Sequence, residues 1–276
     1  ILQQSLNIVK LKGAIMDSTI FDSINKPVIG VIHLLPLPGT PLFSGNLEEI
    51  YQRAQEEVSR FKSGGVDGII IENFHDNPFS NHDISKVQLA IMASVITNAR
   101  KEIDIPIGVN VHFNDWEAEI ALAYACKAQF VRIEAFVDTV MTPSGIVEAC
   151  CAEVTRFRKL IQTENTISIW ADIHPKYSTL LINNSIEESG IMAQNALADA
   201  IIITGETTGI ETPIDDLQRV KSAVKVPILA GSGTTIENVT KVLSVADGVI
   251  VGSTFKSEGN INNLVSVERV GNSNFR

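Results

Sequence analysis

The stretch PILAGSGTTIENV, from Pro227 to Val239, joins a short apolar run to an amphipathic one through the turn GSG. An apolar run followed by a turn and a helical pattern is the repeating unit of a parallel α/β fold. The same unit recurs along the chain from Val28 onward. The apolar runs are VIGVIHL (28–34), VDGIIIEN (66–73), PIGVNVHF (106–113), FVRIEAF (130–136), ISIWADI (167–173), ADAIIIT (198–204), PILAG (227–231) and ADGVIVG (246–252).

Eight such runs, alternating with eight amphipathic stretches, predict an α/β fold of the (β/α)8 class, a TIM barrel. The 276 residues are a usual length for one barrel. A doubly wound fold would carry its glycine fingerprint after the first strand, where this chain has LPLPGTPLFSGN. We therefore expect a single barrel domain over 26–276. The preceding 1–25 are expected to form an N-terminal arm or a non-native extension, with Met16 as a candidate natural start.

Composition narrows the classes of function. A formal net charge of −10 argues against broad binding to nucleic acid or to an anionic membrane. Every apolar run is shorter than the roughly 18 residues that cross a bilayer, so we expect no membrane insertion. The three cysteines, Cys126, Cys150 and Cys151, lack CxxC spacing and fall in helical stretches. Reduced structural thiols of this kind favour a cytoplasmic setting.

Candidate catalytic residues stand where the strands end, because the active sites of TIM barrels lie on the loops that follow strand C-termini. In WADIHPKY, residues two apart face the same side of a strand, so Asp172, His174 and Lys176 are predicted to converge. Asp172 would orient His174 for acid/base work, Lys176 would act as an electrostatic or Schiff-base group, and Glu72 would be a second carboxylate. The alternative is that Lys176 forms an ion pair with Asp172 or Glu134 that only shapes the pocket.

Other strand-end residues are predicted to contact the substrate: His33, Asn73, Asn110, Arg132, Glu134 and Thr204. A buried structural salt bridge explains Arg132 and Glu134 equally well. Glu72, His33, Asp172 and His174 also offer oxygen and nitrogen ligands for a divalent cation. No HExxH-like spacing supports that cation, so no residue is assigned as a metal ligand.

The turns after the last two runs, GSGTTIEN and VGSTFKSEG, are the candidate phosphate site. TIM barrels often hold phosphate on the loops after strands seven and eight, with backbone N–H groups directed at the anion. The predicted phosphate-binding residues are Gly231, Ser232, Gly233, Gly252 and Ser253. The alternative is that the glycines only make the strand-to-helix turn. A dinucleotide fingerprint would need a third glycine where the chain has Ile236, which argues against NAD and FAD.

The chain resembles the BtpA family, also called BtpA/SgcQ, over nearly everything from Lys26 to Val270. The segments that carry the resemblance are KPVIGVIHLLPLPGTP, GGVDGIIIENFHDNPF, IGVNVHFND, FVRIEAF, ADIHPKY, TGETTGIETPIDDL, VPILAGSGTTIENV and ADGVIVGSTFKSEG. The resemblance implies a fold similar to ribulose-phosphate-binding barrels, a phosphate-type site at the two glycine turns, and a polar pocket. That pocket would contain His33, Glu72, Asn73, Asn110, Asp172, His174 and Lys176.

The chain departs from the family pattern at two places. Pro175 and Tyr177 stand in the strand-five segment, where family members carry a second histidine, which weakens a metal or His-pair mechanism. His112 and Phe113 stand where a basic residue is common, which removes one expected anion contact.

Two functions follow as hypotheses. The first is an enzyme that binds a small phosphorylated sugar or nucleoside-like compound and acts on it as a lyase, isomerase or nucleosidase-type hydrolase. The second is a non-catalytic factor, because the family is named for members linked to photosystem I assembly. We also expect a homo-oligomer.

Overall fold

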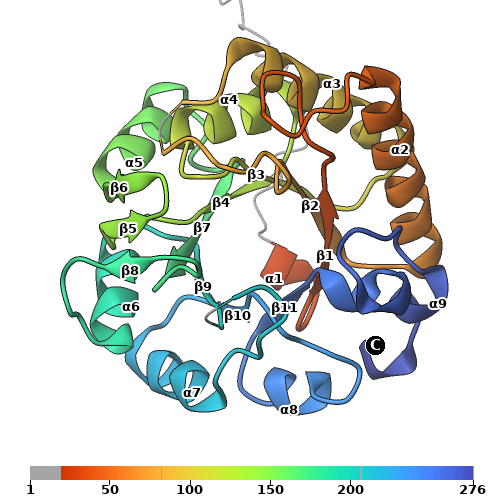
Figure 1. The fold of residues 1–276 in the computed structure, drawn as a ribbon. Coiled ribbons are helices and arrows are strands. Elements are labelled where there is room, and N and C mark those ends of the chain that lie inside the picture. The colour runs from red at the N-terminus through yellow and green to blue at the C-terminus, as the bar shows by residue number, and fades with distance from the viewer. Residues whose placement is uncertain (1–19, 82, 206, 276) are drawn as a thin grey trace, which may run out of the picture.

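The structure is a computed structural model that describes residues 20–275 except 82 and 206. Eight parallel strands close into a barrel that is surrounded by helices (Figure 1). The predicted TIM barrel is therefore confirmed. Around the barrel the strands are β1 (Val28–His33), β2 (Gly68–Glu72), β3 (Ile107–Asn110), β4 (Phe130–Ile133), β7 (Ser168–Ile173), β9 (Ala200–Ile203), β10 (Ile228–Ala230) and β11 (Gly248–Val251).

A helix follows each strand before the next one begins, and the last lies near the C-terminus. The helices are α2 (Leu47–Gly64), α3 (Lys86–Glu102), α4 (Trp116–Cys126), α5 (Cys151–Leu160), α6 (Ile186–Asn195), α7 (Ile214–Ala223), α8 (Val239–Leu243) and α9 (Val267–Val270). Local chemistry sets their ends. Asn46 caps α2 at its start through Glu49 N–H, and Gly65 closes it in a left-handed conformation.

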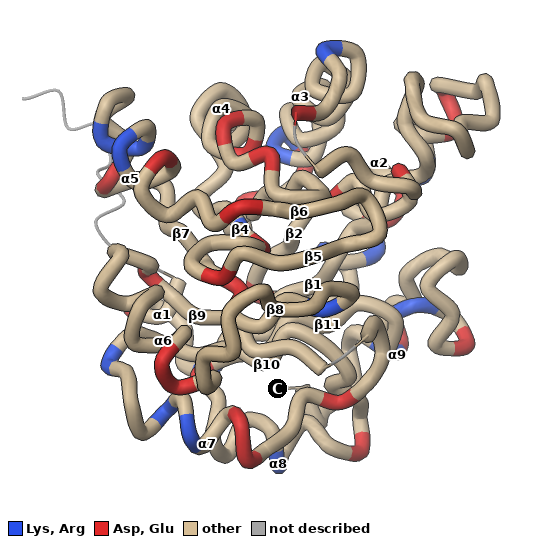
Figure 2. Tube along the Cα trace, turned by 60° about the vertical axis from the view of Figure 1, so that its left-hand side comes forward, with Lys and Arg blue, Asp and Glu red and all other residues tan. Residues whose placement is uncertain are grey.

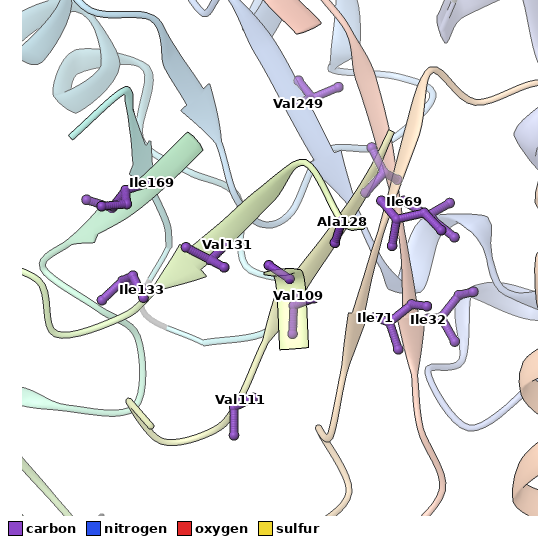
Figure 3. Close-up of a cluster of buried hydrophobic side chains, with 14 of the residues drawn as sticks. Ile32, Ile69, Ile71, Val109, Val111, Ala128, Val131, Ile133, Ile169 and Val249 are labelled. Atoms are coloured by element: carbon purple, nitrogen blue, oxygen red, sulfur yellow. The ribbon is translucent and has the colours of Figure 1, made fainter. Parts of the chain in front are cut away.

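The strands divide their side chains between two apolar cores. In β4, Phe130 points into the barrel, whereas Val131 and Ile133 point outward to the helices. In β2, Ile70 is inward, and Ile69 and Ile71 are outward; the outward set is drawn in Figure 3. Because successive strand residues face opposite sides, this period of two produces the continuous apolar runs of a strand buried on both faces.

The N-terminal end of the barrel is covered by the short helix α1 (Ile20–Ser23). The Phe21 ring lies 5.4 Å from that of Trp170, which stacks on Phe130 at 3.8 Å inside the barrel. Figure 1 shows α1 within the ring of strands. These residues belong to the segment predicted as an arm, and the candidate start Met16 lies outside the described residues.

A second, antiparallel sheet lies on the other side of the barrel, and the sequence did not predict it. It contains β5 (Val140–Thr142), β6 (Gly145–Val147) and β8 (Thr179–Leu180), in the order β6-β5-β8. The first two strands lie in the loop after β4 and the third lies in the loop after β7. The sheet is thus formed by loops at the C-terminal end of the barrel, on the side of β4 and β7 (Figure 1).

Charges are spread over the outside of the fold. Figure 2 shows Lys and Arg positions interspersed with Asp and Glu over several outer helices. In the described part of the chain, the helices are all too short or too polar to span a bilayer.

Candidate active site

Strand residues face alternately into the barrel and out toward the helices. The same alternation directs several charged side chains into the barrel. In four of the strands, the residue two positions beyond an inward apolar side chain is polar and lies on the same face at the C-terminal end of the barrel. The pairs are Val31 and His33, Ile70 and Glu72, Phe130 and Arg132, and Trp170 and Asp172. All four polar members are buried. The lower half of the barrel is therefore apolar, and the upper half holds charge.

Arg132 and Asp172 form a bidentate ion pair. Arg132 Nε donates to Asp172 Oδ1 at 2.9 Å, and Nη2 donates to Oδ2 at 2.8 Å. Arg132 Nη1 lies 4.0 Å from Glu72 Oε2. Both oxygens of Asp172 are thus occupied, so its carboxylate holds the guanidinium in place beside Glu72.

Glu72 lies between two histidines. Its Oε1 is 3.4 Å from His33 Nε2 and 3.6 Å from His112 Nε2. On its other side His112 forms an ion pair with Glu134, with 2.5 Å between Nδ1 and Oε1. The result is a buried chain of ionisable groups that runs from His33 through Glu72 and His112 to Glu134.

Burial and charge move the pKa values of these groups in opposite directions. Burial alone would raise the pKa of Glu72, but His112, His33 and Arg132 outweigh it and hold that pKa well below its ordinary value. Burial would lower the pKa of His112, but Glu134 and Glu72 raise it to about 9. Burial dominates at His33, so its pKa falls well below the ordinary value. At neutral pH, His112 is an imidazolium and His33 a neutral imidazole.

Three buried asparagines hold the strand extensions that carry this chain of ionisable groups. Asn73 accepts from His112 N–H at 2.8 Å and donates to its carbonyl at 3.4 Å. Asn114 does the same at Ala135, the residue after Glu134. Asn110 donates to the carbonyl of Arg132 at 2.9 Å. These amides bridge neighbouring chain segments beyond the ends of the sheet ladder, and so they position His112, Glu134 and Arg132.

Lys176 reaches the same region from the loop after β7. It is half-buried, and burial and the charge of Arg132 lower its pKa. Among the residues that the structure describes, its Nζ has no hydrogen-bond or ion-pair partner. The alternative of a Lys176 ion pair with Asp172 or Glu134 is therefore not realised in this structure.

His174 does not join Lys176. The strand ends at Ile173, and His174 takes a left-handed conformation with φ of 48°, which breaks the alternation. Its N–H donates to Asp138 at 3.1 Å, and its side chain lines neither of the cavities described below. The predicted pairing of Asp172 with His174 is wrong for this reason. The set Glu72, His33, Asp172 and His174 is likewise not gathered, and the described residues contain no cluster of metal-ligand geometry.

Two cavities meet at Lys176. The larger, of about 350 Å³, has aromatic and proline walls from Phe74, Pro78, Phe79, Phe113, Pro143 and Tyr177. Its polar lining includes His112, Glu134 and Lys176. The smaller, of about 30 Å³, lies between the two glycine turns and is also lined by His33, Glu72, Arg132 and Lys176. The smaller space holds roughly two water molecules.

Some groups of the GSG turn are used by the fold, and others have no hydrogen-bond partner among the described residues. Gly233 has φ of 64°, and a Cβ there would lie 2.3 Å from the backbone of Glu211, so packing alone requires glycine. The Ser232 hydroxyl accepts from Gly205 N–H at 2.7 Å and donates to the Ile210 carbonyl at 3.1 Å. The backbone N–H groups of Ser232 and Gly233 have no acceptor within the described ranges. The hydroxyl is thus committed to the fold, and two backbone donors remain.

The predicted residues divide into three groups. Residues that line the smaller cavity together are His33, Glu72, Arg132, Lys176, Gly231, Ser232, Gly233, Gly252 and Ser253. Glu134 lines the larger cavity. Asn73, Asn110, Thr204, Asp172 and His174 line neither, so the expectation that Asn73, Asn110 and Thr204 touch substrate is not supported by their placement.

The sequence marks His112 as a polar residue near a strand end, but sequence reasoning gave it no role in the site and missed the aromatic wall. His112 stands two residues after Asn110 within the predicted run 106–113, so the alternation that selected Asn110 also pointed to it. No comparable pattern marks Phe74, Phe79 and Phe113, because they gather from two separate loops.

Comparison with known proteins agrees with the resemblance. The family model described as "BtpA family" matches residues 24–273. An uncharacterized protein of Pyrococcus abyssi is 39% identical over 251 residues, which cover 89% of this chain and 93% of the relative. The photosystem I biogenesis protein BtpA of Synechocystis is 33% identical over 255 residues, which cover 89% and 86%.

Solved structures share the fold at low sequence identity. (S)-3-O-geranylgeranylglyceryl phosphate synthase from Thermoplasma acidophilum, in complex with its substrate sn-glycerol-1-phosphate, aligns with a TM-score of 0.58 at 13% identity. The alignment covers 90% of this chain and 93% of that chain. N-(5'-phosphoribosyl)anthranilate isomerase from Pyrococcus furiosus aligns with a TM-score of 0.51 at 17% identity, covering 91% and 96%. Both likenesses concern the fold alone.

Proposed function

The chain belongs to the BtpA family, and on that premise we propose that it is an enzyme acting on a small phosphorylated sugar or nucleoside-like compound. The substrate lies at the C-terminal face of the barrel, with its phosphate at the turns after β10 and β11. The observation that carries this proposal is Lys176, an amine without a partner among the described residues that lines both cavities beside the buried chain of ionisable groups.

The phosphate end of the site rests on the two backbone N–H groups at Ser232 and Gly233 and on the Ser253 hydroxyl across the cavity. Lys176 and Arg132 supply positive charge next to these donors. A phosphate group is larger than two water molecules, so its entry requires a movement of Lys176 or of the exposed stretch 207–210. The geranylgeranylglyceryl phosphate synthase and the phosphoribosylanthranilate isomerase that share this fold are both named for phosphorylated compounds. Their names are consistent with a phosphate site in this protein.

The chemistry rests on groups held in different protonation states. His33, a neutral imidazole, can accept a proton, while Lys176 can donate one or act as a nucleophile. Glu72 is an ionised carboxylate that orients both histidines. Asp172 acts through Arg132 as a positioning residue. Proton transfer or bond cleavage on a phosphosugar uses such an arrangement, as isomerases, lyases and nucleosidases do.

The alternative of a non-catalytic assembly factor is supported by the Synechocystis relative, which is named a photosystem I biogenesis protein. A buried ion network is costly to desolvate and is often replaceable by apolar residues without loss of stability. A protein that works through its surface has no need of such a network facing a cavity, and this favours the enzyme.

The test is a calorimetric titration with ribose 5-phosphate, followed by a turnover screen over phosphosugars and nucleotides. Lys176→Met is expected to weaken binding about tenfold or more, because it removes a charge-assisted contact. Lys241→Met, on an exposed face of α8, is the matched control and should bind as the parent does. Glu72→Gln should abolish any turnover found. Equal binding by both lysine variants would contradict the proposal.

A further inference from the structure

The larger cavity contains a carboxylate oxygen that the fold leaves unsatisfied. Glu134 is 3% exposed, and its Oε1 is engaged by His112. Its Oε2 is buried and has no hydrogen-bond partner among the described residues, although the residue lines the cavity. A buried acceptor of this kind is costly unless something donates to it, so a ligand in this cavity that carries a donor would remove that cost.

The walls of the cavity limit the shape of that ligand. Phe79 stacks on His112 with ring centroids 4.8 Å apart and an angle of 25°, and Phe74 and Tyr177 contribute further ring surface. Flat π surfaces favour a planar ring, which stacks offset or edge-on. A volume of about 350 Å³ is at the lower end of ordinary ligand pockets and suits a single small ring system.

The charges that face the cavity exclude other occupants. A cationic ring would be repelled by the His112 imidazolium, and an anionic ring would be repelled by the Glu134 carboxylate. A purely apolar chain would leave Glu134 Oε2 and the Lys176 amine without partners. A neutral ring with an N–H beside a carbonyl oxygen meets both requirements, since the N–H donates to Glu134 and the oxygen accepts from Lys176.

We propose that the larger cavity is a subsite for a planar lactam heterocycle of the nucleobase class, read by Glu134 and Lys176 and enclosed by Phe74, Phe79 and Tyr177. This inference rests on the proposed function and narrows it: the phosphorylated substrate is a nucleotide-like compound and not a bare phosphosugar. Lys176 lies between the two cavities and so contacts the base at one end and stands near the phosphate at the other.

The test compares ligands on the unchanged protein. Uridine and inosine 5'-monophosphates, their N3-methyl and N1-methyl analogues, and ribose 5-phosphate are titrated by calorimetry. At least one parent nucleotide is expected to bind ten times more tightly than ribose 5-phosphate, and its N-methyl analogue is expected to lose that gain, because methylation removes the donor to Glu134. Nucleotides that bind no better than ribose 5-phosphate, or that tolerate the methyl group, would overturn the inference.

Variants give an independent readout. Glu134→Met, which has no acceptor oxygen, should remove the difference between the parent nucleotide and its N-methyl analogue, while Glu148→Met, at an exposed residue outside this cavity, should preserve it. Phe79→Leu should weaken both nucleotides and leave ribose 5-phosphate unchanged. A difference that persists in Glu134→Met would show that Glu134 does not accept the hydrogen bond from the ring N–H.

Failure of this inference and failure of the proposed function are distinguishable. Binding of ribose 5-phosphate without any gain from the base would keep the phosphate site and reject the heterocycle subsite. Binding of free uridine or inosine without any contribution from the phosphate would keep the subsite and reject the phosphate site at the glycine turns.

Discussion

At the scale of the residue, the properties of the site depend on which buried side chains are ionised. His112 stays protonated because Glu72 and Glu134 flank it, and Glu72 stays ionised because His112, His33 and Arg132 surround it. Each group therefore keeps its charge only while its partners keep theirs. Replacing one member changes the protonation of the others, so single variants will report on the network and not on one contact.

The pH dependence of stability follows from His112. Its pKa in the folded protein, about 9, lies above the ordinary value, so its stabilising contribution is complete below pH ~6.5 and is lost as the pH rises through 9. Relative to His112→Gln, the free energy of unfolding of the parent should fall by on the order of 3 kcal/mol between pH 6.5 and pH 10. Urea unfolding of both proteins at the two pH values measures this, and a constant difference between them would rule out the raised pKa.

At the scale of the element, short side-chain amides continue the sheet beyond its ladder. Each of Asn73 and Asn114 offers a donor and an acceptor to one backbone residue of a neighbouring segment, as a further strand residue would. Sequence reasoning placed Asn73 and Asn110 at strand ends correctly but could not distinguish an amide that faces a ligand from one that faces backbone. That distinction depends on the path of the next loop.

The hydrogen bonds between the Asn73 side chain and the backbone of His112 lead to a prediction about stability. Asn73→Ala leaves the N–H of His112 buried without its acceptor, and it should lower the free energy of unfolding by about 1–3 kcal/mol. Asn98→Ala, on an exposed face of α3, should change it by no more than about 0.5 kcal/mol. Chemical denaturation measures the free energy of unfolding of both variants. Equal values would mean that the Asn73 side chain does not stabilise the fold.

The hairpin of β5 and β6 is a second element with a testable contact. Ser144 at its tip donates to the Phe79 carbonyl at 2.5 Å and so ties the hairpin to the loop that walls the larger cavity. Ser144→Ala should speed amide hydrogen exchange in residues 140–147 and at Phe113, whose N–H donates to Ser80. Ser63→Ala loses a comparable bond on exposed α2 and should leave these amides unchanged. Identical exchange patterns would show that the hairpin is held in place without the Ser144 bond.

At the scale of the whole molecule, the barrel and its polar end could be predicted from the sequence, and the small antiparallel sheet could not. Eight apolar runs and a period of two suffice for the strands, and the same period placed His33, Glu72 and Arg132 at the mouth. The pairing of Asp172 with His174 failed because the strand ends one residue too early. The small sheet escaped prediction because β5, β6 and β8 are only two or three residues long and gain their partners across loops.

Helix α1, which covers the N-terminal end of the barrel, leads to a prediction about the stability of the whole domain. Phe21 of α1 contacts Trp170 under the site, so Phe21→Ala should lower the free energy of unfolding by about 2 kcal/mol, as expected for a half-buried ring. Phe21→Leu should retain most of that stability. Thermal unfolding of both variants tests whether α1 belongs to the folded barrel. An unchanged midpoint for Phe21→Ala would show that it does not contribute.

The most direct test of the account is a crystal structure of the protein soaked with ribose 5-phosphate at millimolar concentration. We expect the phosphate between the turns at 231–233 and 252–253, within hydrogen-bond distance of the Ser232 or Gly233 N–H groups and with Lys176 turned toward it. Turns that remain closed and empty, or a phosphate bound elsewhere on the barrel, would show that the proposed phosphate site is wrong.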